Sequence, residues 1–151
     1  MDLKVRGKVK YEFFDEKGVL IKSFTVPNTI HTAGFQEIAS LLVGSGTGIN
    51  YIGVGWGTDS DSAINLGDID LQGISTFRKA MTGKTTDGNK AVYVAGFGLH
   101  EPVNSTITIY ESGLFTASTG GTMIARTIAS PLPTTKTAKT SLTITWELTI
   151  S

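Results

Sequence analysis

The chain has 151 residues, the size of one domain, and a domain of this length buries roughly 68–70% of the surface that its unfolded chain exposes. It contains no cysteine, which excludes disulfides, thiolate metal sites and a cysteine nucleophile. The formal net charge is zero and 17% of the residues are charged, which argues against nucleic acid or an anionic membrane as a partner of the whole molecule. No signal segment or membrane-spanning stretch is visible, so we expect a soluble single domain over residues 1–151.

Residues 2–26 are predicted to form a β-hairpin. Apolar and charged residues alternate strictly along the first half, which is typical of a strand with one buried face. A turn is expected at residues 15–18 and a second strand at residues 19–26. The hairpin either packs on its own domain or reaches to a neighbour as an assembly arm; the sequence leaves both open.

One helix is predicted at about residues 32–43. Phe35, Ile38, Ala39 and Leu42 follow the spacing of a helical apolar stripe, which we expect to lie against a sheet. Thr32 is the candidate N-cap and Gly44 the candidate C-terminal stop.

The remainder is predicted to be mostly β. Thr and Gly are abundant, with 22 and 18 residues, as expected for short strands joined by tight turns. The expected strands are residues 50–57, 74–81, 91–99, 105–111, 122–128 and 141–150, with a long loop at 58–73 and a polar turn region at 82–89. The predicted fold is mainly β, an antiparallel β-sandwich (jelly-roll-like) with one short α-helix. The predicted core is Val5, Val9, Phe35, Ile38, Leu42, Val54, Val94, Phe97, Ile109, Leu114, Ile124, Leu142, Ile144, Trp146 and Leu148.

The sequence offers no complete catalytic or cofactor motif. Gly83-Lys84-Thr85 resembles the end of a phosphate-binding loop, but Arg78 stands where that loop needs its first glycine. His31 and His100 are far apart and belong to no metal-binding frame. Asp59, Asp61, Asp68 and Asp70 lack the glycine and glutamate of an EF-hand loop, so a solvated acidic loop is favoured over an irregular cation site. We expect no enzymatic activity and no cofactor.

Two charged groups are the candidate interface. Lys4, Arg6, Lys8 and Lys10 form a basic stripe, which either protects an outer strand from wrong pairing or contacts an acidic protein surface. The acidic loop with Asp59, Asp61, Asp68 and Asp70 is the candidate for that surface on a neighbouring copy. A second hypothesis is a carbohydrate-binding module in which Tyr51, Trp56 and Tyr93 form a stacking platform for sugar.

Three stretches resemble small structural proteins of tailed bacteriophages and prophages. The first joins Phe35-Gln36-Glu37-Ile38-Ala39-Ser40-Leu41-Leu42 to Ile52-Gly53-Val54-Gly55-Trp56-Gly57-Thr58-Asp59. The second is Ile109-Tyr110-Glu111-Ser112-Gly113-Leu114-Phe115 followed by Gly120-Gly121-Thr122-Met123-Ile124-Ala125-Arg126. The third is Leu142-Thr143-Ile144-Thr145-Trp146. Their order along residues 30–150 carries the resemblance, because each motif alone is degenerate.

The resemblance implies a non-enzymatic virion component, made in the host cytoplasm. Of the positions it allows, a capsid decoration or cement protein is the first expectation, and a tail, baseplate or fibre-attachment protein the second. Its partners would be further copies of itself, most simply as a homotrimer, and the major capsid protein or a tail protein of the same virion. The resemblance assigns no catalytic residues.

Overall fold

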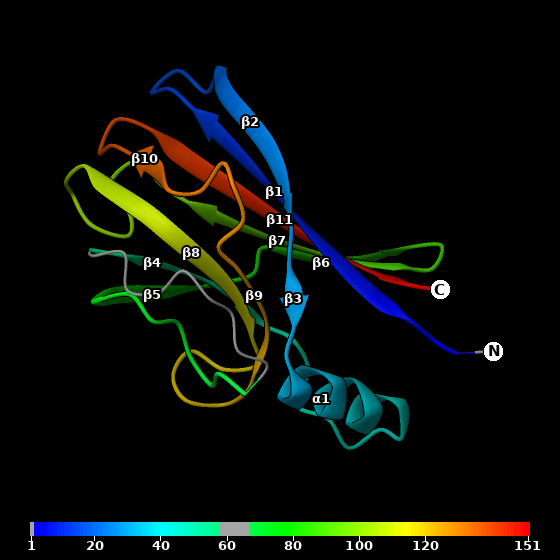
Figure 1. Cartoon of the computed structure of the whole chain (residues 1–151). Helices are drawn as coiled ribbons and strands as arrows, with labels where there is room; N and C mark the ends of the chain where they lie inside the picture. Colours follow the sequence, from blue (N-terminus) through cyan, green and yellow to red (C-terminus); the bar gives the residue numbers. More distant parts are fainter. Residues whose placement is uncertain (1, 58–66) are drawn as a thin grey trace.

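The computed structural model describes residues 2–57 and 67–151, and it shows two antiparallel β-sheets packed face to face (Figure 1). The five-stranded sheet, called sheet A, has the order β2-β1-β11-β7-β6; the six-stranded sheet, called sheet B, has the order β3-β9-β8-β4-β5, with β10 paired to β8. The predicted antiparallel β-sandwich with one short helix is therefore confirmed. The elements are β1 (Val5–Phe14), β2 (Leu20–Pro27), β3 (Thr29–Ile30), α1 (Thr32–Leu42), β4 (Tyr51–Trp56), β5 (Ser75–Ala80), β6 (Gly83–Asp87), β7 (Lys90–Phe97), β8 (Ile107–Phe115), β9 (Met123–Thr127), β10 (Thr134–Lys136) and β11 (Ser141–Ile150).

The predicted hairpin of residues 2–26 is confirmed as β1 and β2, and it packs on its own domain. β1 lies between β2 and β11 in sheet A. The turn is held by Asp15, whose Oδ1 accepts the backbone N–H groups of Lys17 at 2.8 Å and Val19 at 2.9 Å. Gly18 closes it with a φ of 78°, a conformation that favours glycine.

The core lies between the two sheets and holds most of the residues predicted for it, but Val94 and Ile38 are only partly buried and lie outside it. Val9, Tyr11 and Phe13 of β1 point inward together with Leu142, Ile144, Trp146 and Leu148 of β11. Trp146 is fully buried at the centre of sheet A, paired with Val9 on one side and Tyr93 on the other. Across the gap, the ring of Phe77 from β5 meets the ring of Phe97 from β7 edge-on, at 6.2 Å between centroids.

The helix is confirmed, but its apolar stripe does not face the sheet as predicted. Phe35 and Leu42, both assigned to the core by their spacing, are 48% and 77% exposed. The residue that contacts the sheet is Gly34: a Cβ there would lie 2.2 Å from the backbone oxygen of Ile124 in β9. The helix therefore approaches β9 through its glycine side, which turns Phe35 and Leu42 outward.

Two further details of the helix differ from the sequence prediction or refine it. The N-cap is His31 and not Thr32, and no side chain caps this end. Gly44 follows the helix with a φ of 76°, and its N–H donates to the oxygen of Leu41 at 3.1 Å, so the predicted C-terminal stop is confirmed.

Three strands were absent from the prediction. Residues 82–89, interpreted as a polar turn region, contain β6, which pairs with β7 at the edge of sheet A. β3 and β10 are two and three residues long and lack a readable alternation. Among the described residues, no helix is long and apolar enough to cross a bilayer; α1 has 11 residues.

Candidate functional site

The outer face of sheet B is covered by residues 67–73, called the strap below. Leu71 of the strap packs against Phe115 and Met123, with Tyr51 beside them. Glycines make the room: a Cβ on Gly53 would lie 2.9 Å from the Phe115 ring, and one on Gly113 would lie 3.0 Å from Leu71. The glycine-rich sequence of β4 therefore serves close packing.

A buried ion pair lies under the strap. Arg126 of β9 is 0% exposed, and its Nη2 lies 3.1 Å from Oε2 of Glu111 in β8. Asp68 of the strap approaches Nη1 of the same arginine at 3.7 Å. The Glu111 carboxylate also accepts the backbone N–H of Gln72 at 2.6 Å. The strap is thus tied to the ion pair at both of its ends.

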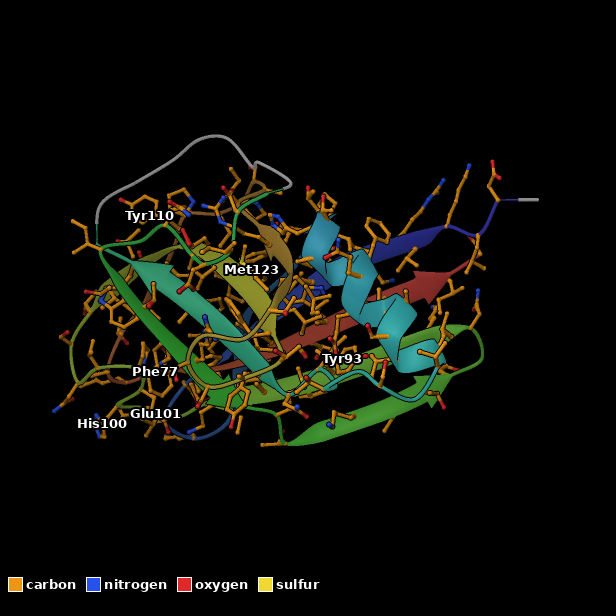
Figure 2. The ribbon with its side chains drawn as sticks, turned by 90° about the horizontal axis from the view of Figure 1, so that it is seen from below. Phe77, Tyr93, His100, Glu101, Tyr110 and Met123 are labelled. Carbon is orange, nitrogen blue, oxygen red and sulfur yellow. The ribbon has the colours of Figure 1, made fainter. Side chains whose placement is uncertain are left out.

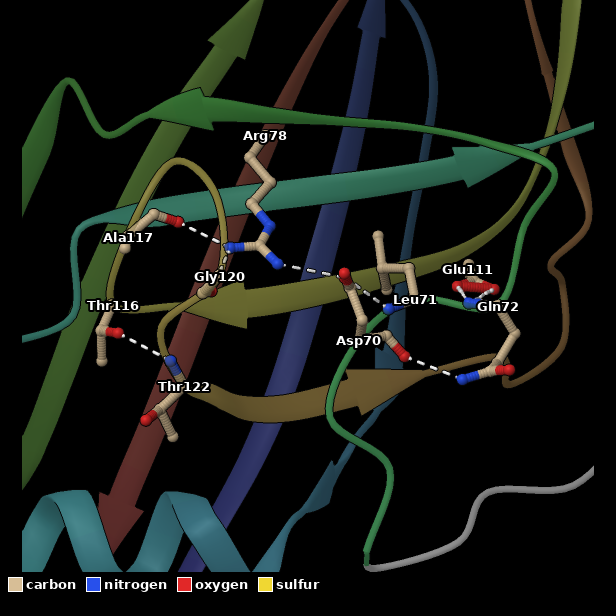
Figure 3. Close-up of polar contacts among 9 residues, drawn as sticks. All are labelled: Asp70, Leu71, Gln72, Arg78, Glu111, Thr116, Ala117, Gly120 and Thr122. Carbon is tan, nitrogen blue, oxygen red and sulfur yellow. Dashed lines mark hydrogen bonds and ion pairs between the residues drawn. The ribbon is translucent and has the colours of Figure 1, made fainter.

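Arg78 holds the other side of the strap (Figure 3). Its Nη1 donates to the backbone oxygens of Ala117 and Gly120, each at 2.8 Å, and its Nη2 pairs with Asp70 at 3.1 Å. The guanidinium lies over the Phe115 ring, 3.7 Å from its centroid. One arginine therefore joins the strap, the loop after β8 and the apolar cluster beneath them.

The structure gives the acidic candidates an intramolecular role. Asp68 pairs with Arg126 and Asp70 with Arg78, so both carboxylates are engaged within the chain. Asp59 and Asp61 lie outside the described residues. No three His, Asp or Glu side chains within residues 2–57 and 67–151 lie close enough together to hold a metal ion.

The basic stripe lies on the outer face of sheet A. Lys8 pairs with Glu147 at 3.4 Å and Lys10 with Glu12 at 3.6 Å, while Lys4 and Arg6 lie at the N-terminal end of the stripe. The interpretation of the stripe as protection of an outer strand is wrong, because β1 is an inner strand with β2 and β11 on its two sides. The edge strand next to β1 is β2, whose Lys22 donates to Thr134 Oγ1 of β10 and lies over the rings of Phe13 and Phe24.

Lys136 was missed by the sequence analysis and forms an unusual buried group. It is 1% exposed, and its ammonium donates to the backbone oxygens of Thr140 at 2.7 Å and Gly98 at 2.9 Å. The oxygens of Leu99 and Thr137 follow at 3.4 Å each. Burial lowers the pKa of Lys136, and the Glu101 carboxylate opposes that shift. The ammonium fastens β10 to the turns that precede β8 and β11.

Tyr11 links the two sheets through the core. Its hydroxyl donates to Ser112 Oγ at 2.7 Å, from β1 to β8. Burial raises the pKa of Tyr11 far above its ordinary value of 10.0, and the hydrogen bond to Ser112 opposes that rise only in part.

We expect this tyrosine to make the fold sensitive to alkali. Below its ordinary pKa of 10.0 the proton is bound in both states. Above it, the unfolded chain loses the proton and the folded chain keeps it, so the free energy of unfolding falls as the pH rises. Tyr11→Phe should lose about 1 kcal/mol at neutral pH and show a shallower alkaline decline. Urea unfolding of both proteins between about pH 8 and about pH 11 measures this.

The comparison between the two proteins isolates Tyr11. Burial also raises the pKa of Tyr93 and lowers that of Lys136, but both residues are present in both proteins. Equal alkaline slopes for the variant and the unchanged chain would contradict the assignment to Tyr11.

Two hollows adjoin at Lys84 of β6. The first, about 540 Å³, lies beside the start of β4 and is lined by Asn50, Tyr51, Ala80, Met81, Lys84, Thr116, Ala117 and Ser118. The second, about 470 Å³, lies between the end of α1 and β7 and is lined by Leu41, Gly48, Ile49, Lys84, Thr85, Thr86, Ala91 and Tyr93. Figure 2 shows Tyr93 beside the C-terminal end of the helix.

The predicted aromatic platform is only partly assembled. Tyr51 lies on the outer face of sheet B, while Trp56 of the same strand packs against the core between the sheets. Tyr93 comes from sheet A and packs at the margin of the same core. Tyr51 and Tyr93 nevertheless line neighbouring hollows, and Trp56 lines neither.

The two histidines lie in different surroundings. His31 is fully buried at the start of α1, and its backbone N–H donates to Ile124 at 2.9 Å. His100 is exposed in the turn after β7 (Figure 2). Gly83-Lys84-Thr85 lies in β6, at a sheet edge, and does not open a helix as a phosphate-binding loop requires.

Exposed apolar side chains gather at two ends of the molecule. At the β1–β2 turn, Val19 and Ile21 are each 56% exposed, with Leu20 between them. At the end of α1, Leu42 and Val43 are 77% and 79% exposed, with Phe35 on the same helix. Figure 1 shows the β1–β2 turn and α1 at opposite ends of the sandwich. They are called the hairpin patch and the helix patch below.

Comparison of the chain with protein-family models, with curated proteins and with solved structures finds no match in any of the three, so the two patches, the strap and the Lys84 hollows are interpreted from their own geometry.

Proposed function

We propose that this chain is a non-enzymatic structural protein of a tailed bacteriophage virion. In this proposal it acts as a capsid decoration or cement protein, through symmetric self-association and contacts to neighbouring capsid proteins. The observation that carries the proposal is the pair of apolar patches at opposite ends of the sandwich. Single exposed apolar residues are ordinary, but contiguous groups mark interaction sites.

The two patches differ from one another, which bears on the kind of assembly. The hairpin patch is a strand turn and the helix patch is the end of a helix. Contact between unlike surfaces of two copies is heterologous, and it forms a closed ring when the rotation between copies closes. A homotrimer is the simplest small ring, and the proposal takes it as the assembled form.

The free edge of β2 is a poorer candidate for the contact between copies. Lys22 points inward from this strand to Thr134, and Pro27 ends it. Inward charges and proline are features that discourage strand-to-strand pairing. We therefore propose that copies contact one another through the two patches and not through the edge of β2.

The experiment is a solution mass by light scattering, followed by two matched variants. The expected mass is three times 16.0 kDa. Leu20→Ser with Ile21→Ser changes the hairpin patch, and Leu42→Ser with Val43→Ser changes the helix patch. Both pairs are exposed, so each variant should fold and lose the trimer. A monomer at every concentration, or a trimer that survives both variants, would refute self-association through the patches.

The position in the particle is tested separately by cryo-microscopy of the parent virion. Copies spread over the capsid support decoration. Copies confined to the tail would replace it with the alternative, a tail, baseplate or fibre-attachment protein. The charged candidates Lys4, Arg6, Lys8 and Lys10 remain predicted contacts to the acidic surface of a neighbouring capsid or tail protein.

A further inference from the structure

The two hollows share Lys84 as a lining residue and are together called the Lys84 groove below. Lys84 of β6 belongs to both hollows. Its Nζ donates to Asn50 Oδ1 at 2.7 Å, so this pair stands where the hollows meet. The hollows have volumes of about 540 Å³ and about 470 Å³ and are both wide open to solvent, so a ligand would lie along the surface and not inside an enclosed pocket.

Each hollow combines one tyrosine with several hydrogen-bonding groups. Tyr51 lines the first and Tyr93 the second, and both are half-buried. Thr116 and Ser118 are among the residues that line the first hollow, and Thr85 and Thr86 among those that line the second. Aromatic rings beside hydroxyls and an amide match the chemistry of a sugar, whose rings have apolar C–H faces and a rim of hydroxyl groups.

Lys84 adds a positive charge that the chain does not neutralise locally. In the part of the chain that the structure describes, Lys8, Lys79 and Lys90 each pair with a glutamate, whereas no acidic side chain pairs with Lys84. An ammonium has three donors, and the hydrogen bond to Asn50 uses one. Two donors remain for a carboxylate that comes from outside.

We propose that the Lys84 groove binds an oligosaccharide that carries a carboxylate, such as a sialylated or uronic acid glycan. Sugar rings lie against Tyr51 and Tyr93, and the carboxylate accepts hydrogen bonds from Lys84. The groove binds and does not hydrolyse, because neither hollow is lined by a described Asp or Glu that could serve as the acid or the nucleophile. The proposal is independent of the patches and of self-association.

The test compares acidic probes with a neutral one, and sialyllactose differs from lactose by the acidic sugar alone. The full chain is titrated with sialyllactose and with lactose, and with trigalacturonate as a second acidic probe, while chemical shifts of backbone amides are followed by NMR. We expect at least one acidic probe to bind about tenfold or more tightly than lactose, with shifts at Asn50, Lys84 and Thr86. One lost charge-assisted contact corresponds to about a tenfold change.

The variants separate this groove from general attraction to a basic surface. Lys84→Met and Tyr51→Ala should each weaken binding about tenfold or more. Lys139→Met, at an exposed lysine outside the groove, is the control and should bind like the unchanged chain. The proposal is overturned if none of the acidic probes binds at millimolar concentration, if lactose binds equally well, or if the control weakens binding as much as Lys84→Met. A lost trimer in the patch variants with sugar binding unchanged would separate this site from the assembly.

Discussion

Glu111→Ala is expected to lower the free energy of unfolding by about 3–5 kcal/mol. The change removes the Glu111 carboxylate, which lies 3.1 Å from Nη2 of the fully buried Arg126 and accepts the backbone N–H of Gln72. Asp68 stays near Arg126, at 3.7 Å, but the loss of a hydrogen-bonded carboxylate from a buried guanidinium is costly because water does not replace the lost contact. Urea unfolding followed by circular dichroism measures the loss.

Two matched variants show whether burial causes this cost. Asp70→Asn weakens the other arginine contact of the strap, but Asp70 is 53% exposed, so the expected loss is under about 1 kcal/mol. The double variant Glu111→Leu with Arg126→Met removes both buried charges. It should cost less than the two single changes added together. If Glu111→Ala lowers the free energy of unfolding no more than Asp70→Asn does, burial is not what makes the Glu111–Arg126 ion pair important for stability.

Trp146→Ala should cost about 3–5 kcal/mol, the ordinary range for truncation of a large core side chain. Trp146 is 0% exposed and stands between Val9 and Tyr93, at the centre of sheet A. Its indole Nε1 has no acceptor among the described residues, so the stabilisation comes from packing of the ring and not from a hydrogen bond. The cavity left by alanine lies between the sheets, where their strands restrict collapse.

Thr145→Ala is the control for this prediction. Thr145 is the neighbour of Trp146 on the same strand and points to the opposite, polar face of sheet A, where it lines a small hollow with Lys8 and Lys10. Its expected effect is within about 0.5–1 kcal/mol. Similar losses for the two variants, by thermal and urea unfolding, would contradict the inward orientation of Trp146.

Strands whose apolar and polar residues alternate clearly were predictable from the sequence. Strands that form only because a neighbouring strand supplies their hydrogen bonds were not. β1 and β11 alternate over ten residues each, so their faces follow from the pattern. β6 is polar throughout and becomes a strand because β7 supplies its partner. The stripe on α1 predicted a buried face, but Gly34 allows a closer approach to β9 than any larger residue on the helix.

The site was less predictable than the fold, because its members meet only after the sheets form. Glu111 and Arg126 face one another from adjacent strands, with the strap laid over them. A charged residue inside each otherwise apolar strand was the one available signal. Trp56 is separated from Tyr51 for a local reason: the two are an odd number of residues apart, and alternation therefore places them on opposite faces of sheet B.

The buried ammonium of Lys136 bears on how the fold depends on the ions in solution. Four backbone oxygens around one positive charge resemble the coordination of a dissolved monovalent cation, but here the charge is covalently attached to β10. An attached cation has no dissociation constant and cannot be exchanged or chelated. In water of low ionic strength, mobile ions leave the protein surface. The ammonium of Lys136 stays, so the contact between β10 and the turns before β8 and β11 keeps its cation.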